Sequence, residues 1–66
     1  MNLSEVIKTR RRTLGISQID LSEMSGVALA TIKDIERGTG NPSMGTVSKI
    51  MDILGMEILL KVRQTV

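Results

Sequence analysis

Residues 17–38 read SQIDLSEMSGVALATIKDIERG, and this stretch decides the fold of the chain. Ser17 is a typical helix N-cap, and Asp20 follows it at the spacing of a capping box. Gly26 tolerates the left-handed backbone that often ends a helix, and a second glycine closes the stretch. The pattern predicts a short helix that ends at Gly26, a tight turn, and a second helix over about 28–37.

Each of these helices is expected to bury one face. Leu21 and Met24 are predicted to face inward from the first helix, and Ile32 and Ile35 form an apolar stripe on the second. Ser22 is small where the helices are expected to cross. Such a pair forms a helix-turn-helix, which places its second helix in the major groove of DNA. An αα-hairpin used only for packing has the same local signals.

Further elements flank this stretch. Asn2 and Glu5 form a capping-box pattern for a helix from about 3 to 14. Ser43 is the expected cap of a fourth helix that ends at Gly55. The inward residues of that helix are predicted to be Met44, Val47, Ile50, Met51 and Leu54. After it, apolar residues recur with a period of two, which predicts a strand over 56–62.

Composition excludes several classes of function. The chain has 66 residues, with no cysteine, histidine or aromatic residue. It therefore lacks thiolate and imidazole metal ligands, the commonest general base, and platforms for stacking single-stranded bases. We expect one small cytoplasmic domain that is not an enzyme, uses no metal or cofactor, and has no membrane partner.

Positive charge gathers near the N-terminus. The net charge is +2, whereas residues 1–16 alone carry +3, from Lys8, Arg10, Arg11 and Arg12 against Glu5. Two interpretations stay open for the cations other than Arg11: a solvated helix face, or long-range attraction to DNA. The basic cluster is assigned to the first helix and not to the helix over 28–37.

Arg11 and Glu36 are expected to form a structural ion pair. Arg11 lies on the apolar face of the first helix, and Glu36 lies beside the Ile32 and Ile35 stripe. A charge in such a position needs a partner. The alternative is that Arg11 extends outward and binds a DNA phosphate, with or without Glu36.

The combined spacing resembles the Xre/Cro/cI family of bacterial and phage repressors. The matching residues are Leu14-Gly15-Ile16-Ser17-Gln18, Leu21, Gly26-Val27, Thr31-Ile32, Ile35-Glu36-Arg37-Gly38 and Pro42. The resemblance implies a mostly α, compact helical, lambda-repressor-like DNA-binding domain over 1–55. It also implies sequence-specific binding of double-stranded DNA by a transcriptional repressor. In that family an arginine of the first helix pairs with the glutamate that matches Glu36.

The resemblance also implies which residues meet DNA. Gln18 matches the phosphate-binding glutamine of the family, and the first residues of the third helix match its base-contacting positions. The predicted DNA-binding residues are Gln18, Ala28, Leu29, Ala30, Thr31, Lys33, Asp34, Arg37, Thr39 and Asn41. Alanine and leucine suit thymine methyl groups, so base recognition is expected to depend on methyl contacts and DNA shape. Asp34 either accepts from a cytosine amine or pairs with Lys33 or Arg37.

The predicted strand needs a partner, because a lone strand is unstable. A second copy of the chain supplies one across a two-fold axis, so residues 56–66 are interpreted as a dimerisation strand and tail. The predicted dimerisation residues are Met56, Ile58, Leu59, Leu60 and Val62. Alternatively, the tail packs on the helical body or continues the fourth helix. A homodimer implies a palindromic operator.

The tail, GMEILLKV, is similar to that of HipB-type antitoxins, which bind a toxin and repress their own operons. This similarity implies autoregulation and a cognate toxin as a partner. The competing hypothesis is a protein-interaction module that binds a partner such as a toxin without specific DNA binding. Its support is the apolar run at 28–30.

Overall fold

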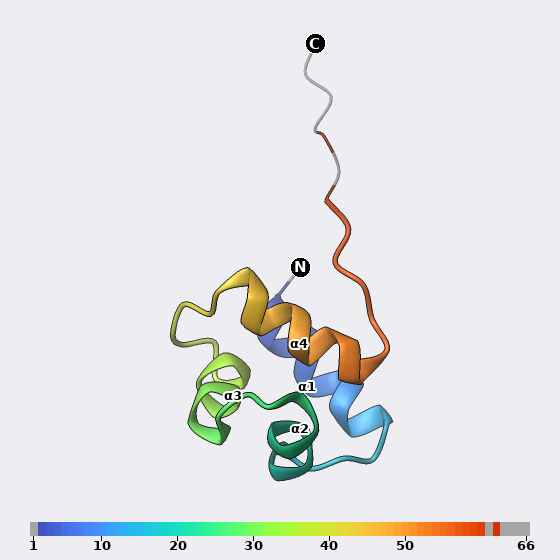
Figure 1. Cartoon of the computed structure of the whole chain (residues 1–66), viewed down its shortest axis with the longest axis vertical. Helices are drawn as coiled ribbons and strands as arrows, with labels where there is room; N and C mark the ends of the chain where they lie inside the picture. The colour runs from blue at the N-terminus through green and yellow to red at the C-terminus, as the bar shows by residue number, and fades with distance from the viewer. Residues whose placement is uncertain (1, 61, 63–66) are drawn as a thin grey trace.

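In the computed structural model, which describes residues 2–60 and 62, the helices pack around a shared hydrophobic core (Figure 1). In chain order the helices are α1 (Leu3–Thr13), α2 (Gln18–Ser25), α3 (Leu29–Glu36) and α4 (Met44–Leu54). α1 and α2 each pack against both α3 and α4. The predicted mostly α fold is confirmed. None of the helices in the described residues has the length and apolar character that a membrane span requires.

Local capping signals set where the helices begin. Ser17 Oγ accepts from the Asp20 backbone N–H at 2.9 Å, and Asp20 Oδ2 accepts from the Ser17 backbone N–H at 2.9 Å. The backbone N–H of Ser17, and after it the Ser17 hydroxyl, lower the pKa of the Asp20 carboxyl by hydrogen bonding to its charged form. α3 lacks such a cap, because Ala28 has no side-chain acceptor. At α1, Asn2 Oδ1 accepts from the Ser4 backbone N–H at 3.0 Å.

The core is aliphatic and draws on every helix. Its buried members are Ile7, Leu21, Val27, Ile32, Ile35, Val47, Ile50, Met51 and Leu54. Two methionines predicted to face inward do not: Met24 is 57% exposed and Met44 is 59% exposed. Each lies at the edge of its helix's apolar stripe, and the neighbouring aliphatic residues already fill the interior.

The turn between α2 and α3 is closed by hydrogen bonds from α2. Gly26 adopts φ +74°, and its N–H donates to the Ser22 carbonyl at 2.9 Å. Ser22 Oγ donates to the Val27 carbonyl at 2.6 Å, and Ser25 Oγ accepts from the Val27 N–H at 3.2 Å. Val27 is itself buried in the core. The turn therefore fixes the direction in which α3 leaves α2.

Gly26→Ala should destabilise the domain through its backbone alone. An added Cβ meets no atom within 4 Å, so the cost is that of a left-handed alanine, about 1–2 kcal/mol. Gly45→Ala is the matched control. Gly45 lies in α4 without a positive φ, and its added Cβ is 3.8 Å from Ser43 Oγ, so alanine there should stabilise by about 0.5–1 kcal/mol. Urea unfolding measures both, and equal effects would contradict the role of the turn.

The chain leaves α4 at a defined joint. Gly55 is left-handed at φ +68°, so the alternative of a continued fourth helix is wrong. Arg10 Nε donates to the Leu54 carbonyl at 2.9 Å, and the Met56 N–H donates to the Met51 carbonyl at 2.9 Å. Met56 is half-buried against the core. This joint ties the end of α4 to α1.

Beyond the joint, the described tail leads away from the helices (Figure 1). Leu59 is 83% exposed, Leu60 87% and Val62 91%, so the alternative of a tail packed on the body is wrong for these residues. Residues 56–60 and 62 form no strand within the described part of the chain, since no second segment lies beside them. Residues 61 and 63–66 lie outside the described residues. The strand therefore stays a prediction.

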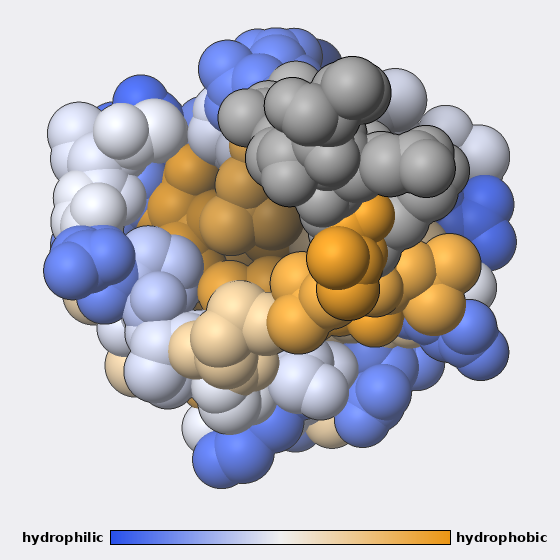
Figure 2. All heavy atoms as spheres, turned by 90° about the horizontal axis from the view of Figure 1, so that it is seen from above, coloured by the Kyte–Doolittle hydropathy of each residue, from blue (hydrophilic) through white to orange (hydrophobic). Residues whose placement is uncertain are grey.

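Apolar side chains gather at the end of the molecule where the tail emerges. Figure 2 shows them around the base of the tail and lining a hollow beside it. Among the predicted dimerisation residues, Leu59, Leu60 and Val62 are almost fully exposed, whereas Ile58 is 37% exposed and Met56 is half-buried.

Candidate nucleic-acid interface

α3 separates into a buried side and an outer side. Ile32, Ile35 and Glu36 are buried. Among the predicted DNA-binding residues, those exposed are Ala28, Ala30, Lys33, Arg37, Thr39 and Asn41, and those half-buried are Gln18, Leu29, Thr31 and Asp34. Leu29 is half-buried and so less accessible than a base-contacting residue is expected to be. The outer side of α3 therefore offers small apolar groups near its start and cations near its end.

Arg11 and Glu36 form a bidentate ion pair between α1 and α3. Arg11 Nε and Nη2 donate to Glu36 Oε2 and Oε1, each at 2.8 Å. Arg11 Nη1 also donates to the Ile16 carbonyl at 3.0 Å. The Arg11 side chain is 11% exposed and that of Glu36 is 2% exposed, so water screens the pair little.

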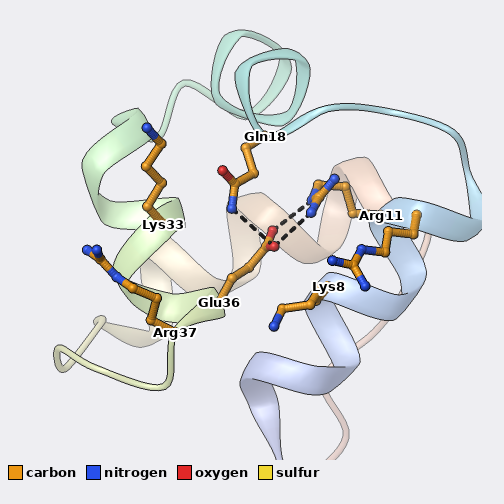
Figure 3. A pocket seen from close by; sticks show the side chains of 7 residues that line it. Lys8, Arg11, Gln18, Lys33, Glu36 and Arg37 are labelled. Atoms are coloured by element: carbon orange, nitrogen blue, oxygen red, sulfur yellow. Dashed lines mark hydrogen bonds and ion pairs between the residues drawn. The ribbon is translucent and has the colours of Figure 1, made fainter.

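Gln18 completes this group from the first turn of α2. Its Nε2 donates to Glu36 Oε1 at 3.2 Å, so the glutamate joins three helices (Figure 3). Burial by itself raises the pKa of Glu36, but hydrogen bonds from Arg11 and Gln18 and the charges of Arg11 and Lys8 outweigh it and lower that pKa. Glu36 is therefore a carboxylate at neutral pH. The amide group of Gln18, the predicted phosphate ligand, is thus hydrogen-bonded to Glu36.

Asp34 lies on the outer side of α3, one turn before Arg37. The two form an ion pair through Arg37 Nη2 and Asp34 Oδ1. This is one of the two roles left open for Asp34, and the partner in it is Arg37 and not Lys33. The side chains of Arg37 and Asp34 are 66% and 46% exposed, so solvent and salt weaken their attraction.

The loop after α3 is held close to the helix. The Thr39 N–H donates to the Asp34 carbonyl at 2.9 Å, and Thr39 Oγ1 donates to the same oxygen at 3.1 Å. These bonds place the predicted contact residues Thr39 and Asn41 beside the end of α3, where both are exposed.

An open cleft of about 450 Å³ lies between α1, α2 and α3. Its lining residues are Lys8, Arg11, Arg12, Gln18, Lys33, Glu36 and Arg37. Figure 3 shows Lys33 and Arg37 extending from α3 and Lys8 and Arg11 from α1, with the Glu36 carboxylate between them. The basic cluster is thus shared between the first and third helices.

Sequence reasoning missed that Lys8 and Arg12 belong beside α3. Their signal was present, because Lys8 and Arg12 are four residues apart and so share a helix face with Arg11. Arg11 was expected to contact Glu36 on the third helix. Lys8 and Arg12 share its face of α1, so they could have been expected to lie near that helix as well.

The sequence of this chain is similar to the sequences of known proteins. A family model described as helix-turn-helix matches residues 7–60. An uncharacterised HTH-type transcriptional regulator of Haemophilus influenzae is 45% identical over 47 residues, covering 71% of this chain and 48% of that protein. An HTH-type regulator of Sinorhizobium fredii is 32% identical over 59 residues, covering 89% of this chain and 30% of the regulator.

A phage protein is also similar. The immunity repressor protein of Bacillus phage phi105 is 29% identical over 58 residues, covering 88% of this chain and 40% of the repressor. The chain spans 16% to 48% of the length of the curated relatives it matches.

Proposed function

This chain belongs to the Xre-type helix-turn-helix family, and from that premise we propose that it binds double-stranded DNA sequence-specifically as a homodimeric transcriptional repressor. The outer side of α3 carries the proposal. Ile32 and Ile35 bury the inner side, and the rigid turn at Gly26 presents the opposite side to solvent. An eight-residue helix exposed in this way fits a major groove.

The chemistry of this side supports a particular mode of recognition. Ala28 and Ala30 are exposed and have no hydrogen-bonding side chain, so they suit thymine methyl groups. Lys33 and Arg37 follow on the exposed side and suit guanine edges or phosphates. We expect fewer direct base hydrogen bonds than usual, with more reliance on methyl contacts and DNA shape.

In the proposed dimer, the two copies pair through their tails. The apolar side chains at 59, 60 and 62 are almost fully exposed, and pairing with a second tail covers them. Two α3 helices then lie about one turn of DNA apart on a palindromic site. Selection of bound sequences from a random pool tests this directly. A palindrome with half-sites one turn apart is expected, and a single asymmetric site contradicts the dimer.

Ala30→Glu should weaken binding to the selected sequence by at least about tenfold, or about 1.4 kcal/mol. Ala30 is exposed and makes no side-chain hydrogen bond, so the substitution spares the fold while placing a negative charge beside the bases. Ser48→Glu, on the exposed part of α4, is the matched control for the change in net charge. Gel-shift titrations compare them, and equal small losses contradict the assignment of α3 to the groove.

Repression of its own operon belongs to this first proposal. A second candidate is a module that binds a protein such as a toxin without specific DNA binding. The observation in its favour is the apolar surface outside the core, which includes Ile19 and Met24 on α2, each 57% exposed. Gel shifts at several salt concentrations separate the candidates. An absence of any specific shift at low salt favours the interaction module.

A further inference from the structure

A groove runs along α1 beside the base of the tail, on a different side of α1 from the basic cleft. Its volume is about 380 Å³. Its lining residues are Glu5, Val6, Thr9, Arg10, Thr13 and Met56. All of these except Met56 follow one another at helical spacing, so they form one stripe on α1. Val6 and Met56 are half-buried apolar residues that pack against the core, and they give the groove an apolar floor.

The tail of the same chain covers this groove only at its base. Met56 is half-buried, whereas Leu59, Leu60 and Val62 are almost fully exposed where the tail leads away from the helices (Figure 1). A ribbon of two strands is marginal in water unless it packs against a helix or a third strand. Two tails that pair with each other therefore need a helical surface beneath them.

The symmetry of the proposed dimer specifies where the second tail lies. All of the predicted strand over 56–62 pairs with its copy only when the two-fold axis passes through residue 59, the centre of the segment. Val62 of the second copy then lies opposite Met56, and Leu60 of the second copy lies opposite Ile58. Directly opposed residues point to the same face of an antiparallel pair, so these side chains face the helices together with Met56.

Charge complementarity on the outer face favours the same register. Glu57 of each copy then lies opposite Lys61 of the other, which makes two cross-strand pairs of opposite charge. A shift of one residue would place Ile58 opposite Lys61 and turn apolar side chains to both faces. The occupant that fits the groove is therefore a second copy of this chain.

We propose that the groove on α1 binds the tail of a second copy, with Leu60 and Val62 of that copy on its apolar floor beside Met56. The inference rests on the proposed function, because it requires the antiparallel dimer. It adds the body of each copy to the interface, so that α1 of one copy is covered by the tail of the other. The paired tails then have the helical support that two strands alone lack.

Disulfide cross-linking tests the contact directly, because the chain has no cysteine of its own. Thr9→Cys is mixed with a Val62→Cys chain that carries a tag of different mass, and the mixture is oxidised. Both residues are exposed in the single chain, so neither substitution alters the core. A disulfide needs Cα atoms within about 7 Å, so a species with one chain of each kind should be at least about tenfold more abundant than with Ser48→Cys in place of Thr9→Cys. Ser48 is exposed on α4 and does not line the groove.

Thr9→Glu tests the same contact at equilibrium. A carboxylate beneath the apolar side chains of a second tail loses water without gaining a partner, so the dissociation constant of the dimer should rise at least about tenfold. Ser48→Glu is the control for charge and should leave that constant unchanged. Thr9→Val keeps the shape of the side chain and should also preserve the dimer. Sedimentation equilibrium measures all three variants, and urea unfolding confirms that each is folded.

The possible outcomes separate the inference from the proposed function. If the wild type is a monomer at every concentration, the proposed dimer fails and the inference fails with it. If the wild type dimerises but Thr9→Cys cross-links no more than Ser48→Cys and Thr9→Glu dimerises like Ser48→Glu, only the groove contact is overturned. A disulfide that forms within a single chain carrying both Thr9→Cys and Val62→Cys, but not between mixed chains, also overturns it, because the chain's own tail then occupies the groove.

Discussion

Arg11→Met should destabilise the domain by about 3–5 kcal/mol, because removing one partner leaves a buried charge uncompensated. Glu36 is 2% exposed, so its carboxylate loses the guanidinium without gaining water. A chain of this size has a total stability of only about 3–10 kcal/mol. The loss is therefore expected to be a large fraction of the total stability. Circular dichroism during urea titration measures the loss.

The double variant Arg11→Met with Glu36→Leu is the control, because it removes both charges together. It should recover more than half of the lost stability, since paired charges replaced by apolar groups often cost little. The amide of Gln18 loses its acceptor, which keeps the recovery incomplete. A double variant as unstable as the single one would show that the residues are not energetically coupled.

The pH dependence of unfolding is a second readout of the same pair. The pKa of Glu36 is lower in the folded state, where burial is outweighed by the bonds and charges of its partners. Its stabilisation is therefore present above the unfolded glutamate pKa of about 4.3 and is lost as the pH falls through the folded value. Asp20 acts in the same direction, because its pKa is also lowered. Glu36→Gln should make stability fall less steeply in acid.

Leu60→Glu should abolish the dimer and weaken binding to a palindromic operator by about 10²–10⁴-fold. Leu60 is 87% exposed in the single chain, so the substitution does not touch the core. A glutamate on the paired apolar face places like charges opposite each other across the two-fold axis. Sedimentation equilibrium gives the oligomeric state, and gel shifts on the selected palindrome give the affinity.

Leu59→Glu distinguishes a paired strand from an apolar tail. Residues 59 and 60 point to opposite faces of a strand, and only the face of Leu60 is continuous with Met56 and Ile58. Leu59→Glu should therefore weaken the dimer less than Leu60→Glu, although Leu59 is 83% exposed and equally apolar. Equal losses would contradict strand pairing, and an unchanged dimer in both variants would place the interface elsewhere.

Local signals were enough to predict the helices. Ser17, Ser43, Gly26 and Gly55 act within a few residues of the backbone that they cap or end, so a single sequence contains the information. The Arg11 and Glu36 contact was also foreseeable, since each charge lies on an otherwise apolar face. Such positions leave few other partners.

The composition of the cleft depended on how helices cross, which one sequence does not specify. Lys8 and Arg12 line the same cleft as Lys33 only because of the way in which α1 packs against α3. Met24 was wrongly placed in the core for a related reason. Which edge of an apolar stripe is buried depends on the neighbouring helix, and not on the period of the pattern.

The hydrogen bond from Arg10 to the Leu54 carbonyl has a mechanical consequence for a tail-linked dimer. It joins the start of the tail to α1, which also contacts α3 through the ion pair at Glu36. The base of the tail and α3, the helix proposed to enter the groove, are therefore connected through α1. In such a dimer this connection limits how far apart the two α3 helices can lie. The half-site spacing that the protein accepts then reflects the stiffness of this joint.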